Sequence, residues 1–133
     1  MNLPLLVAGS ILVGLAALIH IYIFYLESIA WSKPKTWKTF GMRSQEDADI
    51  VRPMAYNQGY YNGFLALGVI VGLVLMYTPG TAQAGFGITL FAALSMVLAA
   101  TVLITSNPKL ARAAVLQGGA PLIGIVLLLL TLV

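Results

Sequence analysis

Two side chains able to transfer protons lie on the first apolar segment of the chain. His20 is the single histidine, and Glu27 follows seven residues later. At about 100° per residue, this spacing places both side chains on nearly one face of a helix, about 10 Å apart along its axis. They would therefore bracket a bound molecule rather than bond to each other. This arrangement suits an acid and a base acting on opposite ends of a small substrate, or a proton-coupled binding site.

Amide side chains gather near the start of the second apolar segment, and a further amide lies in the last one. In helices that alternate in direction, these amides and Glu27 fall in the same half of a membrane. Polar groups inside a membrane usually face a bundle interior or a wet cavity. The sequence therefore predicts a polar pocket in which His20 and Glu27 are catalytic. The residues expected to bind the ligand are Phe24, Trp31, Asn57, Gln58, Tyr61, Asn62 and Gln117, with Phe64 as a further aromatic wall.

Each of these polar groups also has a structural explanation. Amides can hydrogen-bond across helices and hold them together. Glu27 can be an interfacial carboxylate paired with a loop lysine, and His20 can be a neutral histidine that donates to a neighbouring amide or carbonyl. The concurrence of the histidine, the intramembrane carboxylate and four amides on one side favours the pocket.

The elements that must position these residues are membrane helices. The chain has 133 residues, of which 60% are hydrophobic and 8% charged, whereas a soluble domain has about 25% charged residues. Backbone groups in a bilayer must be satisfied internally, which favours helices. We predict an all-α fold, an integral membrane four-helix bundle in one domain. The expected spans cover about residues 3–31, 54–77, 84–105 and 108–132, with a cytoplasmic loop containing a short helix at 32–53.

All seven Lys and Arg residues fall in two segments, residues 33–52 and 109–112. Cytoplasmic loops are enriched in Lys and Arg, whereas translocated loops are not. The distribution predicts a multi-pass protein of the cell inner membrane with both termini on the non-cytoplasmic side. The positive charge lies beside membrane spans, which indicates contact with the lipid bilayer and no nucleic-acid partner. The first apolar run has no basic region before it and is expected to be a retained helix rather than a signal peptide.

Local signals predict where the helices begin and end. Ser44 and the Asn107-Pro108 pair are candidate N-caps, Thr78-Pro79-Gly80 is a turn signal, and Pro53 is expected to interrupt a helix without ending it. Gly68 and Gly72 form a GxxxG step, which suits either packing within the chain or oligomerisation. The absence of cysteine excludes disulfides and thiol catalysis. The single histidine and the few carboxylates argue against a metal site, and no dinucleotide or phosphate-loop fingerprint is present.

The segment from His20 to Glu27, followed by Trp31, resembles the first-helix pattern of small bacterial and fungal membrane proteins grouped as domain of unknown function 1304. The stretch Asn57-Gln58-Gly59-Tyr60-Tyr61-Asn62-Gly63-Phe64-Leu65-Ala66 is similar to the second-helix signature of that family, and Gln117 with Pro121 is similar to its last-helix element. The resemblance implies a four-span inner-membrane protein but no activity. It gives as the shared polar set His20, Glu27, Asn57, Gln58, Asn62 and Gln117.

These observations predict a membrane protein with a cytoplasm-facing polar pocket for a small, lipid-soluble molecule. An acid–base enzyme, such as an isomerase, hydratase or cyclase, fits the pair His20 and Glu27. A small proton-coupled transporter is the second hypothesis. It is disfavoured because Glu27 lies near a helix end and because the charge bias would fix a single orientation. A structural or partner-binding membrane subunit is the third.

Overall fold

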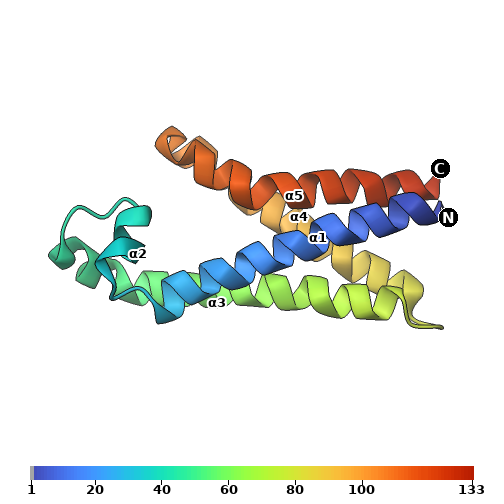
Figure 1. Cartoon of the computed structure of the whole chain (residues 1–133), viewed down its shortest axis with the longest axis horizontal. Coiled ribbons are helices and arrows are strands. Elements are labelled where there is room, and N and C mark those ends of the chain that lie inside the picture. Colours follow the sequence, from blue (N-terminus) through green and yellow to red (C-terminus); the bar gives the residue numbers. More distant parts are fainter. Residues whose placement is uncertain (1) are drawn as a thin grey trace. The chain divides into compact units, whose positions relative to one another are not determined.

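The chain is almost entirely helical, and the computed structural model describes residues 2–133. No strand occurs within this range, so the prediction of an all-α fold is confirmed. Figure 1 shows the helices in chain order, joined by short connections. They are α1 (Leu3–Phe24), η1 (Tyr25–Ile29), α2 (Pro34–Thr39), α3 (Gln45–Met76), α4 (Ala82–Ser106), η2 (Pro108–Leu110), α5 (Ala111–Leu129) and η3 (Leu130–Leu132).

Four helical stretches are long and apolar enough to cross a membrane. They are Leu3–Ile29, Gln45–Met76, Ala82–Ser106 and Pro108–Leu132, and the shortest have 25 residues. At 1.5 Å per residue such a helix is about 37 Å long, compared with about 30 Å for a hydrocarbon core. The chain is therefore a multi-pass membrane protein, in agreement with the four spans predicted from sequence.

The second span differs from its predicted start because α3 begins before its apolar part. Pro53 lies inside this helix of 32 residues and does not end it. The Ser44 hydroxyl accepts a hydrogen bond from the Asp47 backbone N–H at 3.0 Å, which confirms Ser44 as the cap. Glu46 and Asp47 occupy the first turn, where negative side chains interact favourably with the helix dipole.

The chain divides into two compact units. The first contains the residues through Ile19 together with Leu65–Val133. Its core combines small and medium-sized apolar side chains from the part of α1 up to Ile19, the second half of α3, α4 and α5. The buried members are Leu6, Val13, Ala16, Ala17, Ala66, Val69, Met76, Ala92, Ala93, Met96 and Leu128.

Close helix contacts in the first unit depend on small residues. A Cβ at Gly85 would collide with the backbone of Met76, so α3 and α4 can approach closely only with glycine there. Gly68 faces the Cβ of Ala92, which would lie 3.1 Å from an added Cβ, and Gly72 faces Thr89. The contacts of both GxxxG glycines within the chain are therefore with α4.

The turn between α3 and α4 follows the Thr78-Pro79-Gly80 signal. Gly80 has a φ of 83°, a left-handed conformation that glycine adopts without steric cost. The Thr81 hydroxyl donates to the Leu75 carbonyl at 2.9 Å. Within the first unit this turn lies at the same end as the start of α1 and the end of α5 (Figure 1), and the Ser10 and Tyr77 hydroxyls are 2.9 Å apart there.

The second unit is residues His20–Phe64. It contains the last turn of α1, η1, α2 and the first part of α3. Its apolar core is formed by Trp31, Trp37, Ala48 and Ala55, which we call the tryptophan cap. The Trp31 indole N–H donates to the Ala48 carbonyl at 2.9 Å, so the chain after η1 is held against the start of α3.

The connection between α4 and α5 begins at the predicted cap. The Asn107 side-chain oxygen accepts from the Lys109 N–H at 3.2 Å, and Pro108 is the first residue of η2. Proline is favoured at this position because its missing N–H would have no helical partner.

Candidate functional site

The second unit buries a carboxyl group beside an amide. Glu27 is 8% exposed and Asn62 is 9% exposed. The Asn62 side-chain NH₂ donates to Glu27 Oε2 at 2.9 Å. Within the described chain an amide therefore partners this carboxyl, rather than a loop lysine.

A second hydrogen bond fixes the orientation of the Asn62 side chain. Its NH₂ also donates to the Gln58 backbone carbonyl at 3.1 Å. Because the amide has two N–H hydrogens, these two bonds use its whole donor capacity. The Asn62 side-chain oxygen can only accept hydrogen bonds.

Glu27 lies in a π-helical turn. The Ala30 N–H donates to the Tyr25 carbonyl at 2.9 Å, five residues earlier, and this bond closes the wider turn Tyr25–Ile29. Single π-helical turns occur frequently at functional sites. Glu27 is the buried residue of this turn.

Gly59 allows α3 to approach the π-helical turn. A Cβ at this position would collide with Ser28 Oγ and would lie 3.0 Å from Glu27 Cβ. The Ser28 hydroxyl donates to the Tyr56 carbonyl at 2.9 Å, one turn before Gly59. These contacts hold the two backbones together and bring Asn62 within reach of Glu27.

Aromatic rings lie on the same two segments. Phe24 and Tyr60 meet edge to face with centroids 5.2 Å apart. Tyr60 also contacts Tyr56 at 5.0 Å and Phe64 at 6.2 Å. Gly63 leaves room for Phe24, whose ring would be 3.5 Å from an added Cβ. The contact between Phe24 and α3 is therefore part of the same assembly as the Glu27–Asn62 bond.

The remaining predicted site residues have different surroundings. Trp31 is buried in the tryptophan cap and tilts against Phe40 at 5.4 Å, so its ring forms part of that core. Tyr61 and Phe64 are 55% and 60% exposed on α3. Asn57 and Gln58 are also exposed.

His20 and Gln117 belong to separate compact units. His20 is 1% exposed and lies in the second unit, at the end of α1 that leads into the π-helical turn. Gln117 is half-buried in α5, in the first unit. Glu27, Asn62, Phe24 and His20 are thus in the same unit, whereas the predicted contribution of Gln117 remains a prediction.

The Glu27–Asn62 pair can hold the polar group of a small molecule by hydrogen bonds, and the Glu27 carboxyl can give or take a proton. No group of three His, Cys, Asp or Glu side chains within residues 2–133 has the arrangement of a metal site.

Sequence reasoning missed the residues that assemble the pair. The sequence pattern does not mark Ser28 or Gly59 as site residues, and it does not predict the π-helical turn. The spacing of Gly59 and Gly63, four residues apart on one helical face, was the signal available for a close helix contact. The partner of that contact is set by tertiary packing.

Comparisons with known proteins identify the family of the chain. The model of the family described as "Protein of unknown function (DUF1304)" matches residues 14–129. "Uncharacterized protein YpaA" of Lactococcus lactis subsp. lactis (strain IL1403) is 40% identical over 60 residues, which are 44% of this chain and 50% of the relative. The aligned segment thus spans about half of the length of that relative. No solved structure matches the chain. Because the family model covers most of the chain, including the Glu27–Asn62 pair, this protein belongs to the DUF1304 family.

Proposed function

We propose that this protein binds a small, lipid-soluble molecule at a polar site that contains Glu27 and Asn62 and opens toward the cytoplasm. The molecule is largely apolar, because the site lies on membrane-spanning helices. Its polar group meets the carboxyl and the amide, and Phe24 with the exposed aromatic rings of α3 contacts its apolar part.

The buried Glu27–Asn62 hydrogen bond is the observation that carries this proposal. A carboxyl group within a membrane helix is costly and usually functional. A structural ion pair would place a cation beside it, but Asn62 is neutral. Within residues 2–133 no donor bonds to Glu27 Oε1 or to the Asn62 oxygen. These two acceptors suit a ligand with a hydroxyl or amine group.

Acid–base conversion of the bound molecule is the reaction class that fits two proton-transferring groups. In an isomerisation, one group removes a proton from the substrate and the other returns a proton to a different atom, so no co-reactant is needed. Glu27 and His20 take these roles, about 10 Å apart along the helix. Hydration and cyclisation require the same pair of functions. Asn57, Gln58 and Tyr61, which belong to the same compact unit, are the further proposed contacts that orient the substrate.

Analysis of co-purifying molecules tests the proposal. The wild-type protein and Glu27→Gln are purified from membranes in lipid nanodiscs, and their organic extracts are compared by mass spectrometry. Glu46→Gln is the matched control, because it makes the same substitution at an exposed position. We expect the wild type and the control to retain a small molecule that Glu27→Gln has lost. Extracts with the same small-molecule profile for all three proteins would contradict the proposal.

The orientation of the site follows from the distribution of charge. Because all Lys and Arg lie in residues 33–52 and 109–112, we place these segments in the cytoplasm and both termini on the other side of the cell inner membrane. Reporter fusions after Val133 and within residues 78–83 should behave as translocated. Cytoplasmic activity of the fusion after Val133 would reverse the orientation and the opening of the site.

A further inference from the structure

The connection between the first two spans carries positive charge without acidic residues. Between Glu27 and Glu46 the chain has no Asp or Glu. The first span ends at Ile29, so this connection begins at the depth of the lipid headgroups. Its cations are Lys33, Lys35, Lys38 and Arg43.

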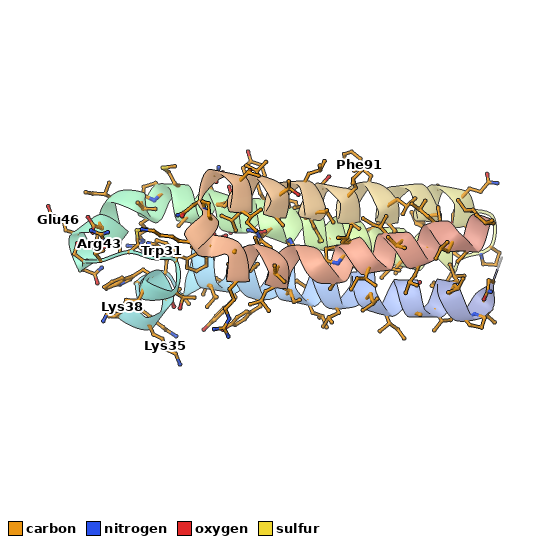
Figure 2. All side chains as sticks on the ribbon, turned by 90° about the horizontal axis from the view of Figure 1, so that it is seen from above. Trp31, Lys35, Lys38, Arg43, Glu46 and Phe91 are labelled. Atoms are coloured by element: carbon orange, nitrogen blue, oxygen red, sulfur yellow. The ribbon has the colours of Figure 1, made fainter. Side chains whose placement is uncertain are left out.

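The short helix α2 separates these cations from the core. Thr36 and Trp37 are each 5% exposed, whereas Lys35 and Lys38 are exposed. Figure 2 shows Lys35 and Lys38 pointing away from the α2 ribbon into open space. Lys33, immediately before the helix, is also exposed. We call Lys33, Lys35 and Lys38 the cationic face.

The tryptophan cap fixes this face on the protein. Trp31 precedes Lys33 by two residues and is hydrogen-bonded to the Ala48 carbonyl. Trp37, which lies between Lys35 and Lys38 in the sequence, is buried. The Met42 N–H donates to the Trp37 carbonyl at 3.2 Å, which closes the loop after α2. The lysines are therefore presented by an anchored element rather than by a free loop.

The charges of the cationic face are not neutralised within the part of the chain that the structure describes. No ion pair joins these lysines to Glu46, Asp47 or Asp49. Lys38 lies over the ring of Trp37, 5.5 Å from its centroid. The buried Trp37 indole N–H has no acceptor among the described residues. The cationic face thus presents positive charges that no acidic side chain among the described residues neutralises.

We propose that the cationic face binds the headgroups of anionic phospholipids in the adjacent leaflet. Basic segments next to a membrane span are attracted to anionic lipids, and the attraction acts within about one Debye length of the surface. Phosphate oxygens accept the hydrogen bonds that lysine donates. This inference does not depend on the ligand of the Glu27–Asn62 site.

Tryptophan fluorescence provides the test. Trp31 and Trp37 are the two tryptophans of the chain, and both lie in the tryptophan cap, so their emission reports on the lipids around it. The full-length protein is reconstituted with brominated phosphatidylglycerol or brominated phosphatidylcholine, which quench nearby tryptophans. We expect stronger quenching by the anionic lipid. In the triple variant Lys33→Gln/Lys35→Gln/Lys38→Gln, the relative binding constant of that lipid should fall by roughly tenfold or more.

The variant Lys109→Gln/Arg112→Gln is the matched control, because it removes charge from the other basic segment. It should keep the preference of the wild type, whereas equal losses in both variants would overturn the assignment to the cationic face.

The wild type alone gives a second measurement if the triple variant does not fold. Its preference should decline as potassium chloride is added. Equal quenching by the two lipids, or a preference insensitive to salt, would refute the proposal. Inorganic phosphate and potassium chloride are also compared at the same ionic strength. If only phosphate abolishes the preference for the anionic lipid, the lysines form a site for free phosphate and the proposal is wrong.

Discussion

The two compact units of this protein bury different kinds of side chains. In the unit formed by the residues through Ile19 and Leu65–Val133, the buried polar side chains among those described are Thr89 and Thr131, and neither is titratable near neutral pH. The unit His20–Phe64 buries His20, Glu27, Thr36 and Asn62. Both buried ionisable side chains among the described residues, His20 and Glu27, thus occur in the smaller unit.

Close contacts between helices bring different side chains together in the two units. In the larger unit, small residues allow close helix contacts, as at Gly85 and Met76. In the smaller unit, Gly59 provides an equally close contact but brings a carboxyl and an amide together. Because glycine has no Cβ, it allows a close helix contact in both units. The contact lies in an apolar core in one unit and beside a buried polar pair in the other.

The largest effect on stability is expected from removing the amide partner of Glu27. Asn62→Leu leaves the carboxyl without its donor and should lower the free energy of unfolding by about 3 kcal/mol. Asn57→Leu is the control, because Asn57 is an exposed asparagine of the same helix. Thermal melting in detergent measures both variants. Equal melting temperatures would show that the Asn62–Glu27 bond contributes little.

Adding a methyl group at the close contact should have a somewhat smaller effect. Gly59→Ala places a Cβ against Ser28 and Glu27, and we expect a loss of about 2 kcal/mol from the strain of overpacking. Gly87→Ala is the matched control, since an added Cβ at Gly87 meets nothing within 4 Å. That variant should be neutral or slightly more stable, because alanine has the higher helix propensity. A stable Gly59→Ala protein would argue against the tight approach.

The two tryptophans of the cap allow a test of one hydrogen bond. Trp31→Phe removes the donor to the Ala48 carbonyl and should cost about 1 kcal/mol beyond the change in ring size. Trp37→Phe removes an indole N–H that has no partner among the described residues, so it should cost less. Urea denaturation of the two variants measures the difference. A greater loss for Trp37→Phe would contradict this assignment.

The smallest effect on stability is expected for the proposed proton-transferring groups. Glu27→Gln keeps the size of the side chain and its acceptor oxygen while removing the charge, so the melting temperature should stay the same or rise. His20→Gln should behave alike, and both variants should lose ligand binding. A clear fall in melting temperature for both would favour the structural explanation of these residues.

The sequence by itself determined the membrane architecture. The runs of apolar residues are as long as a bilayer is thick, and caps such as Ser44 and turns such as Thr78-Pro79-Gly80 are local signals that act over three or four residues. The structure confirms these features. The family could also be recognised from the sequence, because the signature at Asn57–Ala66 is a contiguous stretch of chain.

Only the tertiary structure decided which polar residues meet. Helical periodicity placed His20 and Glu27 on one face but could not show that Glu27 lies in a π-helical turn, which depends on one backbone bond from Ala30 to Tyr25. Nor could it distinguish buried Asn62 from exposed Asn57. The rotation of α3 is set by where Gly59 allows another backbone to approach. Contacts between segments distant in sequence depend on packing, which local patterns do not encode.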